Sequence, residues 1–372
     1  MKKIFLIFSL FCLMLTGCGK KNEKEVLREF ENKVNDAKAY YLTGNMELTN
    51  NEDVYTYKIM VSYSMDDNYK IELVNMVNDH KQVILRNKDG VYIITPSLNK
   101  SFKFQSDWPY NNSQVYLLAS LLDDIRNDDK RTFEVSSDGY IFTSTVNYPN
   151  NEKLVKQKVY FDKDYLPKMV EVIDSDGNVQ IKMVFDKIDL KVEFNDTYFD
   201  LNSILDTQNG IKSRKDDDKT KTDNINENNN QNTENDNPDN LENQEPNNND
   251  NTSNTKQTAT IDDIIYPMYL PVNTYLTGQK KVATDSGERL ILTFTGDKSF
   301  VLVEETARYT DMPEIIPTYG SVELIGPSLA VVNENSANWF NNGIEYYVVS
   351  DVMDTDELLQ VVRSISVLPV SK

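Results

Sequence analysis

From residue 39 onward, the hydrophobic pattern of the chain has a period of two. The clearest case is Tyr55, Tyr57, Ile59, Val61 and Tyr63, which alternate with residues of mixed polarity. Such alternation is typical of an antiparallel strand with one face on a core. Asp-Gly pairs at 89–90, 138–139 and 176–177 are hairpin turn signals. The pattern predicts further strands over 39–49, 69–77, 82–86, 91–96, 101–104, 132–136, 140–147, 154–161, 167–174, 179–185 and 190–194.

Two segments have a helical period instead. From Glu25, the residues Val26, Leu27, Phe30, Val34 and Ala37 fall near one helical face, with charged residues opposite. The segment 112–127 is apolar over more than one face, through Val115, Leu117, Leu118, Leu121, Leu122 and Ile125. We expect this second helix to pack against the concave side of the sheet, either as plain core or as a movable lid.

A polar stretch divides the rest of the chain. Residues 207–259 are dominated by Asn with Asp and Glu, and such a composition predicts a disordered linker because it buries too little apolar surface. A second unit, 260–372, follows, with strands expected over 290–294, 299–303, 322–325, 329–332 and 344–349. Thr355 is the expected N-cap of a last helix over 356–364. The expected domains are thus 25–206, mainly β, and 260–372, a small α+β unit.

The N-terminus carries a sorting signal. Lys2 and Lys3 precede an apolar run over 4–14, which is too short to span a bilayer. Leu15-Thr16-Gly17-Cys18 then resembles the lipobox of bacterial diacylglyceryl lipoproteins. That resemblance implies a signal peptide over 1–17, lipid on Cys18 and a short tether over 18–24. Two acyl chains on Cys18 would anchor the protein stably to the cell membrane, with the body on the extracytoplasmic face.

Composition narrows the function further. The formal net charge is −20, from 59 acidic and 39 basic residues, which argues against nucleic acid as a partner. Cys12 falls in the signal peptide and Cys18 would carry lipid, so no disulfide and no thiol nucleophile are expected in the mature chain. His80 is the only histidine, and it is expected in an exposed turn. We therefore expect no catalytic residues, no metal site, no cofactor and no enzyme activity.

The order of several motifs resembles a known superfamily. The motifs run from Asp89-Gly90-Val91-Tyr92 through Val159-Tyr160-Phe161-Asp162 and Tyr165-Leu166-Pro167-Lys168 to Phe185-Asp186-Lys187-Ile188. This succession is similar to the lipoprotein carriers of the LolA/LolB kind. The resemblance implies an unclosed antiparallel β half-barrel, covered by helices, with an apolar cavity for acyl chains. Candidate cavity-lining residues are Tyr55, Tyr57, Ile59, Val61, Tyr63, Leu118, Leu121 and Leu122; the same residues could form ordinary sheet core.

The second unit resembles the small C-terminal domain of RseB-type envelope regulators, on Tyr269-Leu270-Pro271, the stretch 292–300 and Trp339. In endospore formers, the combination is similar to GerS-type sporulation and germination lipoproteins. The first hypothesis is therefore a non-enzymatic binding or scaffold module for an envelope protein, such as a cell-wall amidase. The alternative is a carrier or envelope-stress sensor that binds lipid or lipopeptide acyl chains. An apolar cavity of about 300 Å³ or more would favour the alternative.

Overall fold

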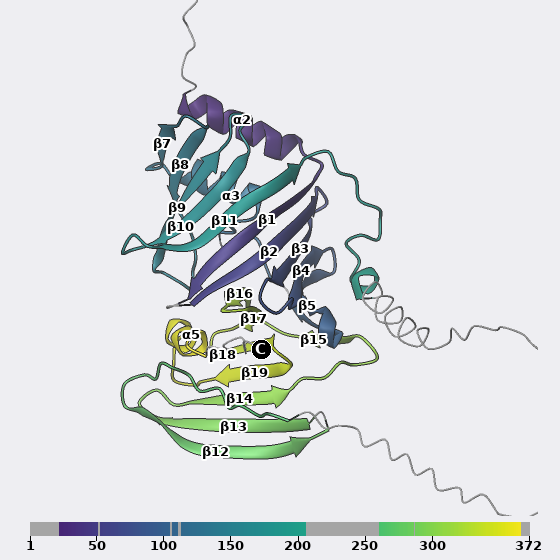
Figure 1. The fold of residues 1–372 in the computed structure, drawn as a ribbon, viewed down its shortest axis with the longest axis vertical. Helices are drawn as coiled ribbons and strands as arrows, with labels where there is room; N and C mark the ends of the chain where they lie inside the picture. The colour runs from purple at the N-terminus through teal and green to yellow at the C-terminus, as the bar shows by residue number, and fades with distance from the viewer. Residues whose placement is uncertain are drawn as a thin grey trace, which may run out of the picture.

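The computed structural model describes residues 22–50, 53–104, 106–110, 113–205, 260–285 and 287–365. We call residues 22–205 the first unit and residues 260–365 the second unit. The expected signal peptide, the lipidated Cys18 and the expected disordered linker over 207–259 lie outside the described residues. The fold is mainly β with few helices, as the pattern predicts, and is built on two sheets that do not close (Figure 1).

The first sheet has 12 strands in the order β15-β6-β5-β4-β3-β2-β1-β11-β10-β9-β8-β7. Neighbours pair antiparallel, except for β15 and β6, which run parallel. Its strands are β1 (Ala39–Asn50), β2 (Asp53–Ser64), β3 (Asn68–Asn75), β4 (Lys81–Asn87), β5 (Gly90–Thr95), β6 (Lys100–Phe104), β7 (Thr132–Val135), β8 (Tyr140–Thr145), β9 (Leu154–Phe161), β10 (Pro167–Asp174), β11 (Val179–Asp189) and β15 (Glu314–Pro317).

Two helices cover the concave face of this sheet. α2 (Glu23–Asp36) crosses one end of the sheet and buries Val26 and Phe30 (Figure 1). Asn22 caps α2, because its side chain accepts a hydrogen bond from the Glu25 backbone N–H at 2.9 Å. α3 (Leu118–Asn127) packs beside α2 and buries four aliphatic side chains. A short 3₁₀ turn, η1 (Pro96–Leu98), joins β5 to β6.

The second sheet has seven strands in the order β12-β13-β14-β19-β18-β17-β16. They are β12 (Thr274–Thr284), β13 (Gly287–Gly296), β14 (Phe300–Thr306), β16 (Ser321–Ile325), β17 (Ser328–Val332), β18 (Ser336–Asn341) and β19 (Ile344–Val349). α5 (Thr355–Arg363) packs on one face through Leu358, Leu359, Val361 and Val362. Trp339 is core and stacks on Tyr346 with ring centroids 5.1 Å apart.

Several local expectations need correction. The helix expected over 112–127 begins only at Leu118, and the strand expected over 190–194 does not form. The last helix is capped by Asp354, whose carboxylate accepts from the Glu357 N–H, and not by Thr355. His80 is half-buried and not exposed. Strands β12, β15 and β18 were not expected, because β12 is mostly exposed and β15 has only four residues.

Candidate functional site

The concave face of the first sheet is packed with the protein's own side chains. Ile59, Val61, Leu118 and Leu121 are fully buried in one apolar cluster, together with Tyr55, Tyr57 and Leu122. Tyr63 is partly buried against the same cluster and stacks on Tyr40. The expected inward face of β2 is therefore present, but the residues predicted to line a lipid cavity are packed as sheet and helix core. Whether any of them contacts a ligand stays a prediction.

We call the open end of the half-barrel the mouth. It is lined by Tyr55, Tyr57, Leu73 and Gln82. The β16–β17 hairpin, residues 321–332, lies across this mouth, between the first sheet and the rest of the second sheet (Figure 1). The two faces of the hairpin pack in two different cores. Val322, Leu324, Leu329 and Val331 pack in the cluster of the first unit, while Ile325, Ala330 and Val332 pack in the core of the second unit. A strand buried on both faces needs a continuous apolar run, which Leu329–Val332 supplies.

Side chains of the mouth bind the main chain of the hairpin. The Gln82 side-chain oxygen accepts from the Leu329 backbone N–H at 2.6 Å, and the Gln82 amide nitrogen donates to the Leu329 carbonyl oxygen at 3.4 Å. Tyr57 donates its hydroxyl to the Gly326 carbonyl oxygen. Gly326 has a φ of 51°, a left-handed conformation that favours glycine at this turn. The hairpin is thus bound through groups that every polypeptide has.

A second connection between the units is the strand β15, which adds to the edge of the first sheet. Four residues pair in parallel with β6, from Glu314 beside Lys100 to Pro317 beside Lys103. The Asn99 side chain donates to the Thr310 carbonyl oxygen at 2.9 Å, and Lys100 forms an ion pair with Glu314 at 3.2 Å. The two units are therefore joined by strand pairing, side-chain contacts and shared core.

A small apolar cavity of about 130 Å³ remains between the hairpin and the mouth. Its wall is mainly aliphatic and aromatic, and Glu323 and Arg363 stand among its polar lining residues. Burial raises the pKa of the Glu323 carboxyl, although the hydrogen bond from the Asn150 amide at 2.6 Å acts against this shift. Arg363 donates to the Asn150 carbonyl oxygen at 2.9 Å, so Asn150 links both charged groups to the first unit.

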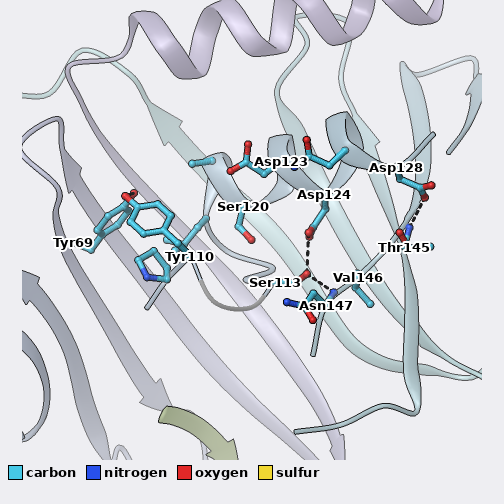
Figure 2. A pocket seen from close by; sticks show the side chains of 14 residues that line it. Tyr69, Tyr110, Ser113, Ser120, Asp123, Asp124, Asp128, Thr145, Val146 and Asn147 are labelled. Atoms are coloured by element: carbon cyan, nitrogen blue, oxygen red, sulfur yellow. Dashed lines mark hydrogen bonds between the residues drawn. The ribbon is translucent and has the colours of Figure 1, made fainter. Parts of the chain in front are cut away.

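A larger hollow of about 370 Å³ lies beside α3, and its lining is mixed polar and apolar (Figure 2). Ser113 donates to Asp124 at 3.0 Å and accepts from the Asn147 backbone N–H at 2.8 Å. Burial raises the pKa of Asp124 to about 7, against the hydrogen bonds from Ser113 and Gln157. Asp128 accepts the Thr145 N–H at the far side of the hollow. The hollow can hold a polar group, but its carboxylates are already engaged within the protein.

Both strands of the hairpin were expected, over 322–325 and 329–332, but neither its position across the mouth nor the hollow beside α3 was predicted. Asp124 follows the buried Leu121 by three positions, so the helix turns this residue inward. The signal for the hairpin was its uninterrupted apolar run, which distinguishes β17 from the alternating strands. Among the described residues, no three or more His, Cys, Asp or Glu side chains lie together so that they could hold a metal ion. Within the same ranges, no helix is long and apolar enough to cross a bilayer.

Several solved structures align with this chain. The complex of MucA and MucB from Pseudomonas aeruginosa aligns over 90% of this chain and 97% of that chain, at 12% identity and a TM-score of 0.27. The complex of the CwlD amidase with the GerS lipoprotein from Clostridioides difficile aligns over 47% of this chain and 98% of that chain, at 16% identity and a TM-score of 0.28. A putative outer membrane lipoprotein-sorting protein domain from Vibrio parahaemolyticus aligns over 49% of this chain and 97% of that chain, at 13% identity and a TM-score of 0.29. We infer no function from likenesses of this size.

The sequence itself has a clear relative. Over 355 residues the chain is 29% identical to Sporulation protein YdcC of Bacillus subtilis (strain 168), covering 95% of this chain and 93% of the relative. The family model described as "Sporulation protein YdcC-like" matches residues 1–199. This match spans more than half of the chain, including the strands β1 to β11 of the first sheet. The chain therefore belongs to the family of YdcC-like sporulation proteins.

Proposed function

We propose that this sporulation protein is a lipid-anchored, extracytoplasmic docking protein, which binds an envelope protein and performs no chemistry itself. One observation supports this above all: the mouth of the half-barrel is occupied by the chain's own hairpin. The apolar space that remains is about 130 Å³. Pockets that hold small molecules usually measure about 300–1,000 Å³. A protein surface is thus the better-supported ligand, and an envelope amidase is the kind of partner that the sequence resemblance implies.

The experiment is cross-linking in intact sporulating cells with the full-length chain carrying a C-terminal tag, followed by reconstitution with the purified candidate. We expect an envelope protein that is captured only when Cys18 is present, and that binds the purified chain directly. The matched control is Cys18→Ala, which keeps the folded units but lacks the anchor. Failure to recover any envelope protein with the anchored chain, in cells that complete sporulation, would contradict the proposal.

A second candidate function is the binding of acyl chains, as a carrier or stress sensor. The observation in its favour is that the 130 Å³ cavity is largely apolar and lies in the mouth itself. To hold a whole acyl chain, the hairpin would have to leave the mouth, because its side chains occupy the space that the chain needs. This candidate therefore requires a ligand that replaces the hairpin, and lipid that co-purifies with the protein would support it.

A further inference from the structure

We propose that the mouth is a receptor for an extended peptide segment, and that a segment of the docking partner replaces the resident β16–β17 hairpin there. This inference rests on the proposed docking function and names its site. The mouth holds the hairpin through Gln82 and Tyr57, which bind backbone N–H and carbonyl groups. Recognition of main chain is independent of side-chain identity, as in the addition of a peptide strand to a sheet edge.

Side chains then define the class of segment that fits. Val322, Leu324, Leu329 and Val331 are the aliphatic hairpin residues that pack in the cluster of the first unit, and Glu323 adds one carboxyl group, which the Asn150 amide holds. The aliphatic residues meet a surface of Tyr and Leu, with Tyr55 beside the Gly326 turn. The partner segment is therefore extended and aliphatic at alternate positions, with room for one acidic group where the Asn150 amide donates. A charged residue at one of the aliphatic positions would lose its hydration without an ion partner.

The interface between the resident hairpin, the neighbouring strand β18 and the mouth has two packing faults. Asn341, at 1% exposure, has no hydrogen-bond partner for either side-chain atom and borders a gap of about 20 Å³ lined also by Tyr55 and Asn75. The 130 Å³ cavity is a second void in the same interface. Both faults would be relieved when the hairpin leaves, because water or a fuller ligand could then reach these groups.

An acyl chain is the competing occupant, and Gln82 distinguishes the two. A peptide offers the N–H and carbonyl pair that Gln82 binds, whereas a hydrocarbon chain offers neither group. Removal of the Gln82 side chain should therefore weaken a peptide and leave an acyl chain unaffected.

The test uses the full-length chain with Leu324→Asp, which places a charge on the hairpin face toward the first unit and none in the second core. The probe is a fluorescent peptide with the sequence of residues 321–332, followed by anisotropy. We expect at least tenfold tighter binding to Leu324→Asp than to the unaltered chain, because the resident no longer competes. Adding Gln82→Ala should weaken binding at least tenfold. The control is Tyr275→Asp, on the exposed edge strand β12, which should behave as the unaltered chain.

Asn150→Asp is a second way to displace the hairpin, since it sets a carboxylate against the half-buried Glu323 without altering an apolar side chain. Asn150→Asp takes the place of Leu324→Asp in the binding test if circular dichroism shows that Leu324→Asp lowers the folded fraction. Equal peptide binding by displaced and control variants, or binding unaffected by Gln82→Ala, would overturn the inference. Palmitate binding that is insensitive to Gln82→Ala, without peptide binding, would assign the mouth to acyl chains. If the peptide does not bind but the reconstituted partner still does, the docking function stands and only the mouth is wrong as the docking site.

Discussion

The side-chain amide of Gln82 pairs with both backbone groups of Leu329, a residue 247 positions away, with its oxygen 2.6 Å from the Leu329 nitrogen. The pair joins a strand of the first sheet to a hairpin of the second. Gln82 and Leu329 are both buried, at 3% exposure each, so neither backbone group of Leu329 has water as an alternative partner. The contact therefore fixes the second unit over the mouth of the first.

Gln82→Ala should lower the free energy of unfolding by about 1–3 kcal/mol, because it leaves a buried N–H and carbonyl without partners. Urea denaturation followed by tryptophan fluorescence measures the change, since Trp108 lines the cavity beside the hairpin. Gln279→Ala is the matched control: Gln279 is exposed on β12 and accepts only the Tyr266 hydroxyl at 3.1 Å. We expect the control to stay within about 0.5 kcal/mol. Equal effects of the two substitutions would argue against docking through Gln82.

Leu121→Ala should lower the free energy of unfolding by about 2–5 kcal/mol, the usual effect of a cavity opened in a packed core. Leu121 is fully buried in the cluster that fills the concave face. If this residue instead lined an open lipid cavity, its truncation would create little new void and a much smaller effect. Thermal denaturation distinguishes the cases, with Val135→Ala on the exposed edge strand β7 as the control.

Stability should fall as pH rises from about 4 to 7 because of Asp124. Burial raises the pKa of this carboxyl to about 7 in the folded protein, above the ordinary value of 3.8. Between these values the unfolded chain loses its proton first, and this favours unfolding. Each pKa unit corresponds to about 1.4 kcal/mol, so the loss should be on the order of 2–4 kcal/mol. Asp124→Asn should remove this slope in urea titrations at pH 4 and 7.5; an unchanged slope would contradict the assignment.

The contribution of Asp128 to stability should change with pH in the opposite direction, so Asp128 serves as the control. The backbone N–H groups of Thr145 and Lys130 hydrogen-bond its carboxylate and lower its pKa. Its contribution to stability is therefore present above pH 4 and lost as pH falls through the folded pKa. Asp128→Asn should be less stable than the unaltered chain at pH 7, with the difference shrinking at pH 3. A difference that grows toward acid would refute this explanation.

Cys18→Ala should move the protein from the membrane fraction to the soluble extracytoplasmic fraction and abolish the incorporation of labelled palmitate. The expectation follows from the lipobox at 15–18, since the anchor would reside in acyl chains on this cysteine. Ser9→Ala, inside the expected signal peptide, is a control that should leave anchoring intact. Retention of the Cys18→Ala protein in washed membranes, at the level of the control, would show that another element holds it there.

The alternating pattern predicted most of the first sheet, because a sheet with one buried face leaves a period of two in the sequence. Strands such as β9 and β10 have the expected bounds. The same pattern did not predict β15, whose pairing with β6 joins residues more than 200 positions apart. Nor could it place Gln82 opposite Leu329. A polar residue inside an apolar strand signals a buried contact, but its partner depends on how the two units dock.

The most direct test of the occupied mouth is native mass spectrometry of the mature full-length chain, purified from membranes under conditions that keep lipids bound. If the hairpin fills the mouth, the mass should equal the polypeptide plus the acyl groups on Cys18, and organic extraction should leave it unchanged. An additional lipid mass that organic extraction removes, and that Leu324→Asp increases, would contradict the account and assign the half-barrel to acyl chains.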